Sequence, residues 1–572
     1  MSRRINRAMT ATLATLPLDI ILSISALLSD PLDLLSLSQV RRTTQILASD
    51  TNPYVDAKTC HSAFLASQAW ASYWSKLVPA VHLSRPAPWH SYSPSELRDA
   101  HIRYATTHRQ WQSPSPTFKP PLRLPPLQDS NGYSDNSQRW RLIRGTRWAW
   151  YFWRLTGEIH FCDLRAGLVI GKWSAGGPVI DAFIESRSPN EWVLCQYWKT
   201  SHKEDILEYV LDPEGLDTTR FEIVATSVTI EQEKLTSPTK LSFRTIQRAP
   251  IDDRTSLSNG SFTTPMVLWR DYLIGSYVRP QPRTHGLFLW NMRENVIFYF
   301  EVCHSYFPSP GALNPNSRQM EFRPRCTKVI GDLLFTIPNM PDGTDWNTTY
   351  HCIHLPSLVT TTQVPGGFLS LTENTFAMLL PKSIIESRGR WSPFYAHSKI
   401  YSIPACTPTH PRYCFIIKRF AAPSWGVEWM VFEVEIDMRI PGPIKGFSKV
   451  SQQYTVQCPI NPLYDVDDDL LLYLPLGRED ISRASLCIQF LRVGKPGKKR
   501  LARLKGMVNL HSYGLSVDRD AGYVIFWATE DRPPYRSDHF IWWLDERKLG
   551  NMVYSQTRGL ISGWSRGLLR RL

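Results

Sequence analysis

The densest group of residues able to do chemistry is a basic run near the C-terminal end of the sequence. It comprises Lys495, Lys498, Lys499, Arg500, Arg503 and Lys505. Residues 478–572 hold 18 Lys and Arg against 9 Asp and Glu, so they supply +9 of the net charge of +14. Such a cluster can contact nucleic-acid phosphates, act as a nuclear-localisation signal or bind an acidic or phosphorylated target. The alternative interpretation is an exposed, solvated loop.

An acidic run, Asp465-Val466-Asp467-Asp468-Asp469, is the main candidate for cation binding. It lacks the central Gly and the distal Glu of a calcium loop. It also directly precedes the aliphatic segment 470–474, which is typical of a strand, and charged residues often flank such segments to prevent aggregation. We therefore expect these carboxylates to lie in a solvated loop.

Other catalytic and metal-binding motifs are incomplete. The segment 563–567 matches the nucleophile pattern GxSxG, but the five residues after it include no acid or His to complete a triad. The nearest approaches to metal sites are His351, Cys352 and His354, and Cys406, His410 and Cys414. Neither set has paired zinc-ligand spacing. We expect no catalytic, cofactor-binding or metal-binding residues, no cofactor and no enzymatic activity.

Composition limits the classes of protein that the chain can belong to. Its 572 residues are 42% hydrophobic and 20% charged, which is globular rather than disordered or collagen-like. No apolar run approaches the roughly 18 residues that cross a bilayer, so we expect no membrane partner. The ten cysteines are scattered without a dense framework, which favours a reducing compartment, cytoplasmic or nuclear.

The N-terminal segment predicts short helices that could present or support functional side chains. Pro17 suits a first helical position, Asp19 complements the helix dipole, and the aliphatic residues of 20–28 recur with helical spacing. Asp30 and Pro31 begin a second helix in the same way, and a third covers 40–48. Three such small helices need a partner surface to bury their aliphatic side chains.

These helices resemble an F-box. The resemblance covers residues 13–50 and consists of Leu-Pro, an acidic residue and paired aliphatics at 16–21, then Asp-Leu-Leu at 33–35 and Val40-Arg41. Thr43 and Thr44 stand where the family usually has an aromatic residue. The resemblance implies docking onto a Skp-type adaptor and, through it, a cullin scaffold. The adaptor-binding positions that the resemblance implies are Leu16, Pro17, Ile20, Ile24, Leu34, Leu35 and Val40.

The sequence divides into an N-terminal helical part and a C-terminal β part, an α+β multidomain organisation. We expect a basic tail at 1–12, the F-box at 13–50, a helical spacer at 51–111, a Pro-rich linker at 112–138 and a β domain at 139–572. Pro-Pro pairs and Ser-Pro repeats in 112–138 are typical of a semi-rigid extended spacer.

The β domain shows paired strand-like segments with turn residues between them. The seven pairs are 148–153 with 159–164, 192–198 with 206–211, 272–278 with 286–292, 333–337 with 350–355, 413–419 with 429–436, 470–474 with 485–492, and 523–528 with 540–544. Several second strands end much as a WD-type blade does, although no Trp-Asp or Gly-His dipeptide is present. We predict a divergent β-propeller of about seven blades, with tandem β-sandwiches as the alternative.

This layout resembles fungal F-box proteins that carry a WD-like propeller. The resemblance implies a non-catalytic substrate receptor of an SCF-type ubiquitin ligase, with an unidentified target protein bound by the propeller. A propeller scaffold or nucleic-acid-binding protein without a ligase role is the alternative, and the basic run motivates it.

Overall fold

The structure is a computed structural model, and most of the residues it describes are in β-strands, with few in helices. It describes residues 106–127, 140–153, 156–174, 179–188, 191–199, 221–231, 240–251, 266–280, 283–301, 323–339, 351–361, 368–370, 398–403, 409–421, 426–460, 463–474, 485–504, 511–529 and 537–544. The β domain that the sequence predicts is thereby confirmed. The F-box segment lies outside the described residues.

The first three groups of strands follow the chain in order. One sheet contains β2 (Arg141–Leu142), β3 (Trp148–Phe152), β4 (Glu158–Asp163) and β5 (Leu168–Ser174). The next contains β6 (Val179–Ser188), β7 (Glu191–Lys199), β8 (Phe221–Glu231) and β9 (Lys240–Ile251). The third contains β10 (Val267–Trp269), β11 (Tyr272–Pro280), β12 (Arg283–Asn291), β13 (Val296–Glu301) and, in parallel to β13, β17 (Phe368–Ser370).

The fourth and fifth groups share one seven-stranded sheet. The fourth has β14 (Arg323–Ile330), β15 (Leu333–Asn339) and β16 (His351–His354), followed by helix α7 (Leu355–Thr361). The fifth has β18 (Ser398–Ser402), β19 (Arg412–Ala421), β20 (Gly426–Asp437) and β21 (Ile444–Ile460). The first residues of β21 pair with β16 and the rest with β20, so this long strand joins the two groups.

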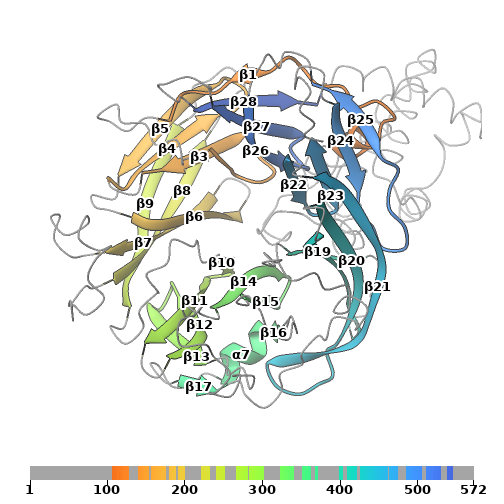
Figure 1. Cartoon of the computed structure of the whole chain (residues 1–572). Coiled ribbons are helices and arrows are strands. Elements are labelled where there is room, and N and C mark those ends of the chain that lie inside the picture. The colour runs from red at the N-terminus through yellow and green to blue at the C-terminus, as the bar shows by residue number, and fades with distance from the viewer. Residues whose placement is uncertain are drawn as a thin grey trace, which may run out of the picture.

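The last two groups complete the described strands. One contains β22 (Leu463–Asp467), β23 (Leu470–Leu474), β24 (Ser485–Phe490) and β25 (Arg500–Arg503). The other contains β26 (His511–Asp518), β27 (Tyr523–Thr529), β28 (Ser537–Trp543) and, from the start of the chain, β1 (Leu122–Arg123). Figure 1 shows the groups following one another around a common centre.

Seven hydrophobic clusters connect the seven groups of strands. Each cluster lies between two consecutive groups, from the one between β2–β5 and β6–β9 to the one between β22–β25 and β26–β28. The seventh joins the last group to the first through Ile525 and Ile541 on one side and Tyr151 on the other. Sheets buried on both faces explain the continuous apolar sequences of β3 and β23, in which all residues are buried. The packing therefore closes on itself.

Tryptophan is prominent in several of these interfaces. Among the described residues, the five largest side chains that are almost fully buried are all tryptophans: Trp111, Trp140, Trp290, Trp429 and Trp542. A buried indole removes roughly 200 Å² from water, so these residues account for much of the core.

The Pro-rich segment differs from the predicted spacer. In its described part, Phe118 bridges to Leu544, and β1 pairs with β28 in register Leu122 opposite Ile541. Leu124 and Leu127 are each only 3% exposed in the cluster that joins the first and last groups. Proline does not prevent this pairing because β1 is an edge strand. Residues 118–127 therefore belong to the β domain.

Six of the seven predicted strand pairs are confirmed by the antiparallel register. They correspond to β3–β4, β11–β12, β15–β16, β19–β20, β23–β24 and β27–β28. The exception is the second pair, because β7 lies between β6 and β8, and β8 begins at Phe221 rather than in 206–211. Among the described helices, none is long and apolar enough to cross a membrane.

Candidate functional site

The acidic run does not form a solvated loop, which corrects the expectation from sequence. Asp467, Asp468 and Asp469 make the tight connection between β22 and β23, and they are only 2%, 1% and 7% exposed. Asp468 has a backbone φ of 47°, a left-handed conformation that Asp tolerates better than most residues. The prediction failed because the partners of these carboxylates come from distant parts of the chain.

Two basic residues from other groups of strands pair with this turn. Arg144, in the connection between β2 and β3, lies 3.1 Å from a carboxylate oxygen of Asp467. Lys328 of β14 donates a hydrogen bond of 2.8 Å to Asp468. The side chains of Arg144 and Asp467 are 40% and 3% exposed, and those of Lys328 and Asp468 are 23% and 1% exposed, so in each pair the acid is the more deeply desolvated member. These pairs connect the sixth group of strands to the first and the fourth.

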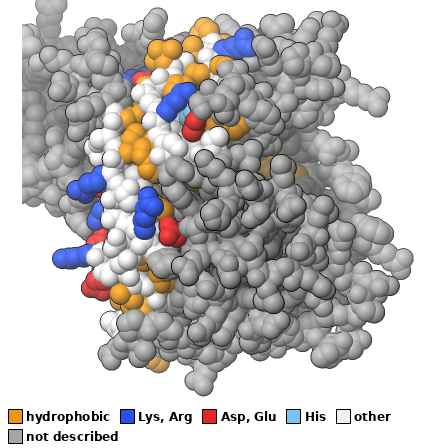
Figure 2. All heavy atoms as spheres, turned by 90° about the vertical axis from the view of Figure 1, so that its left-hand side faces the viewer, with side chains coloured by type: hydrophobic (Ala, Val, Ile, Leu, Met, Phe, Trp, Pro, Cys, Tyr) orange, Lys and Arg blue, Asp and Glu red, His pale blue; other side chains and the backbone are white. Residues whose placement is uncertain are grey.

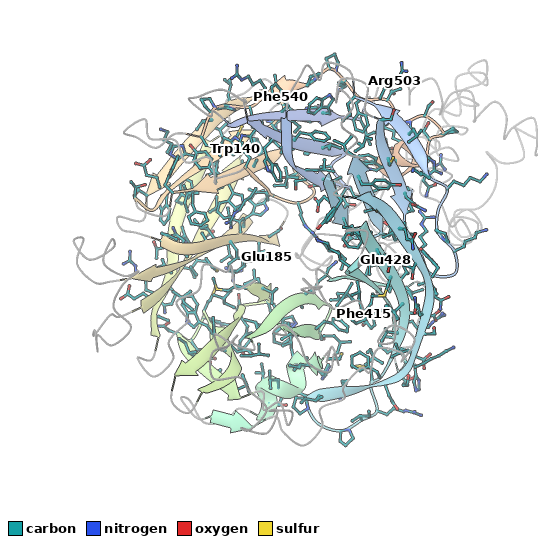
Figure 3. All side chains as sticks on the ribbon, in the orientation of Figure 1. Trp140, Glu185, Phe415, Glu428, Arg503 and Phe540 are labelled. Atoms are coloured by element: carbon teal, nitrogen blue, oxygen red, sulfur yellow. The ribbon has the colours of Figure 1, made fainter. Side chains whose placement is uncertain are left out.

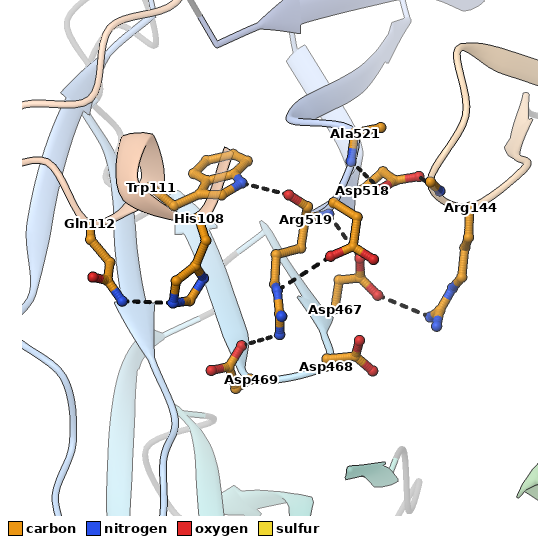
Figure 4. A network of polar contacts seen from close by, with 12 residues as sticks. His108, Trp111, Gln112, Arg144, Asp467, Asp468, Asp469, Asp518, Arg519 and Ala521 are labelled. Atoms are coloured by element: carbon orange, nitrogen blue, oxygen red, sulfur yellow. Dashed lines mark hydrogen bonds and ion pairs between the residues drawn. The ribbon is translucent and has the colours of Figure 1, made fainter. Parts of the chain in front are cut away.

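A second part of the cluster is built around Arg519, in the turn between β26 and β27. Its guanidinium, 5% exposed, donates to Asp469, and Asp469 also lies 3.3 Å from Arg492. The backbone N–H of Arg519 donates to Asp467 at 2.8 Å. Its backbone carbonyl accepts a 2.8 Å hydrogen bond from the indole of Trp111, which ends the helix 106–111 (Figure 4). Arg519 therefore connects three segments of the chain.

Two further carboxylates accept backbone N–H groups from neighbouring groups of strands. Asp465 of β22 accepts from Val517 at 2.8 Å. Asp518 accepts from Gly145 at 2.7 Å and from Ala521 at 2.8 Å. Hydrogen bonds to a charged acceptor are stronger than neutral ones, so these contacts hold adjacent edges in register.

Burial makes several of these acids unusually weak. Burial raises the pKa of Asp518 to about 7, and it also raises the pKa of Asp465 and of Asp520. Burial likewise raises the pKa of Glu185 on β6 to about 7, although Arg144 and Lys328 oppose the shift. Glu185 lies toward the centre of the ring in Figure 3. Burial lowers the pKa of Lys399 on β18, with Arg144 adding repulsion.

The contacts of this cluster join neighbouring groups of strands, and its geometry is not that of a metal site or an activated nucleophile. In the described part of the chain, no three His, Cys, Asp or Glu side chains are placed to hold a metal ion together. Cys352 and Cys414 are buried, and burial raises the pKa of both thiols, which disfavours the nucleophilic thiolate. His354 instead hydrogen-bonds to Ser357 at 2.6 Å. Cys406 and the GxSxG segment lie outside the described residues.

The basic run lies on the outer strand β25 and on the connection that leads to it. Lys495, Lys498, Lys499 and Arg503 are exposed, and Arg500 is partly buried. Figure 3 shows Arg503 at the outer rim of the ring, away from the central cluster. The ammonium of Lys499 lies 5.2 Å from the ring centre of Tyr473. The expected exposure is thus confirmed for these four residues, but part of the run is a strand rather than a loop.

The remaining predicted site residues cannot be placed. Lys505 and the adaptor-binding residues Leu16, Pro17, Ile20, Ile24, Leu34, Leu35 and Val40 lie outside the described residues. Conversely, Arg144 and Lys328 could not be selected from the sequence, because the acids with which they pair, Asp467 and Asp468, are far away along the chain. The Asp518-Arg519-Asp520 turn offered the one local sign of a charged contact.

Known proteins resemble the chain in structure, at low sequence identity. No protein-family model matches the sequence, and no curated protein matches it. Among solved structures, an oligogalacturonate lyase in complex with manganese is similar over 76% of this chain and 98% of its own, with 8% identity and a TM-score of 0.34. The Dos1 propeller is similar over 74% and 83%, with 9% identity and a TM-score of 0.31. A Trypanosoma rangeli sialidase is similar over 77% and 62%, with 7% identity and a TM-score of 0.34.

Proposed function

We propose that the described strands form a seven-bladed β-propeller, and that the chain is the substrate-recognition subunit of an SCF-type ubiquitin ligase. The strand order supports the propeller. Seven groups of antiparallel strands follow one another around a centre, seven hydrophobic clusters join them in a closed series, and β1 completes the last group. Closure through a strand from the opposite end of the chain removes the free sheet edge that an open array would leave.

The ligase role is carried by one observation, the F-box-like spacing of residues 16–41 ahead of this ring. In the proposed arrangement, those residues bind a Skp-type adaptor and the ring binds a target protein. The chain then supplies no reacting group. It raises the effective concentration of the target near the ubiquitin-conjugating enzyme that the cullin scaffold carries.

Co-purification of a Skp-type adaptor with the full chain tests this proposal. We expect the wild-type protein to retain the adaptor, and Leu16→Ala/Pro17→Ala to reduce retention at least about tenfold, because both residues belong to the proposed contact. Ser23→Ala/Ser29→Ala is the matched control, with two substitutions in the same segment at positions outside the motif. Failure of the wild-type chain to bind, where a known F-box protein does, would refute the ligase role.

A further inference from the structure

Strand β25 has an edge to which no other described strand is paired. It forms the end of its sheet and pairs only with β24, in register Leu486 opposite Ala502 and Ser485 opposite Arg503. Leu501 is 56% exposed, and among the described large hydrophobic residues only Leu168 is more exposed. The alternation of exposed Leu501, buried Ala502 and exposed Arg503 is that of a regular strand.

The approach to this edge is uniformly basic. Residues 492–503 contain Arg492, Lys495, Lys498, Lys499, Arg500 and Arg503 and no acidic residue. Arg492 is paired with Asp469 of the central cluster, which leaves the other five without an acidic partner among the described residues. A chain that binds here therefore has to bring negative charge.

The side chains of β25 alternate between its two faces. Leu501 and Arg503 share the exposed face, whereas Arg500, which is only partly exposed, shares the other face with buried Ala502. Leu501 and Arg503 are therefore the two side chains of β25 that a strand added at this edge would meet on the exposed face.

Sheets of this molecule accept additional strands from distant parts of the chain. Strand β17 pairs in parallel with the outer strand β13, and β1 pairs with β28. Strand β13 is the fourth strand of its group, as β25 is of its own, whereas β1 supplies the fourth strand of the group that contains β26–β28. An added strand at β25 would repeat this arrangement with a strand supplied by another molecule.

We propose that the outer edge of β25 binds an extended acidic peptide segment by strand addition, with Arg503 pairing with a carboxylate of the peptide and Leu501 contacting an apolar side chain on the same face. The backbone groups of a strand edge match a peptide backbone and have no counterpart in a nucleic acid, which favours a peptide. That this peptide belongs to a ligase target rests on the proposed function. The binding itself does not.

Fluorescence anisotropy with the full chain tests the proposal. The probe is a labelled Val-Glu peptide of about twelve residues with the repeat Glu-Thr-Val-Thr, so that Glu and Val share one face of the extended peptide, as Arg503 and Leu501 do on β25. A second peptide of the same sequence is N-methylated at every second residue, which keeps the charge but removes strand pairing. A single-stranded oligothymidine of about equal charge is the third probe.

We expect the Val-Glu peptide to bind, and N-methylation to weaken binding at least about tenfold. Leu501→Gln/Arg503→Gln should weaken it by a similar factor, because it removes both side chains of the proposed contact. The matched control is Arg244→Gln/Arg248→Gln, which removes two exposed arginines from another outer strand, β9. That strand belongs to the face seen in Figure 2, where Lys and Arg are interspersed with acidic and hydrophobic side chains. The control should bind the peptide as the wild type does.

Three results would overturn the proposal. If the N-methylated peptide binds as tightly as the unmethylated one, binding depends on charge alone and involves no strand addition. Stronger binding of the oligothymidine than of either peptide would make this a nucleic-acid site. If no probe binds, the basic side chains serve only to prevent aggregation through an exposed strand edge. Leu16→Ala/Pro17→Ala should bind the peptide normally, so the ligase role and the peptide site can fail separately.

Discussion

The buried pair of Asp469 and Arg519 should show strong energetic coupling. Both side chains are at most 10% exposed, and they connect the turn after β22 to the turn after β26. Removing one partner of a buried ion pair costs about 3–5 kcal/mol because the other charge stays desolvated, whereas replacing both with apolar residues is often neutral. Arg492, 3.3 Å from Asp469 and 45% exposed, retains part of the attraction. We therefore expect Arg519→Met to cost about 3 kcal/mol, at the lower end of that range.

The measurement is a double-mutant cycle on the full chain with Arg519→Met, Asp469→Leu and their combination. Guanidinium unfolding followed by tryptophan fluorescence reports on this region, since the indole of Trp111 donates to the carbonyl of Arg519. The double variant should be more stable than Arg519→Met alone, with a coupling energy of about 2 kcal/mol. Arg439→Met, which removes an exposed pair with Asp437, should leave the midpoint unchanged. Additivity of the two single variants within about 0.5 kcal/mol would refute the reasoning.

Two other predictions concern stability. Because burial raises the pKa of Glu185 from 4.5 to about 7, its folded form holds a proton more tightly than its unfolded form. Stability is therefore lost as pH rises from about 4.5 to about 7, by at most roughly 3 kcal/mol and less with solvent screening of this partly exposed side chain. Glu185→Gln should reduce the difference in unfolding midpoint between about pH 5 and about pH 8, and an unchanged difference would contradict the assignment. Gly514→Ala would place a Cβ 1.8 Å from the rigid ring of Trp527, so we expect a lowered melting temperature in differential scanning calorimetry. In Gly171→Ala, the added Cβ would lie 2.4 Å from the flexible end of Leu241, so this variant should lower the melting temperature much less. Equal decreases in melting temperature would show that the contact with Trp527 does not determine the loss of stability.

Local sequence patterns predicted the strands that pair with their nearest neighbours in the chain. Pairs such as β19–β20 have short connections and apolar, β-branched sequences, so their register follows from adjacency. The sequence signal was weaker for the first and last strands of each group. Strand β14 is interrupted by Pro324 and carries three basic residues, and β8 is separated from β7 by 21 residues, 200–220.

The charged cluster could not be predicted because no local pattern reports its partners. Asp468 pairs with Lys328 and Asp467 with Arg144, and both cations stand far away in the sequence and in unremarkable surroundings. When the partners are not known, the four Asp residues of segment 465–469 cannot be distinguished from those of a solvated loop. The Pro-rich segment did contain a usable sign, since Phe118, Leu122, Leu124 and Leu127 provide apolar side chains that a solvated spacer does not need.

The pairing of β1 with β28 fixes an order of events during synthesis. Residues 122–123 leave the ribosome before almost the whole ring, yet their partners are Phe540 and Ile541. At about 5–20 residues per second, roughly 20 to 80 s pass between the two segments, during which β1 has no sheet to join. The helix 106–111 acquires its contact with Arg519 only in the same late step. A truncated or incompletely folded chain would therefore lack the contact that fixes its early residues against the ring.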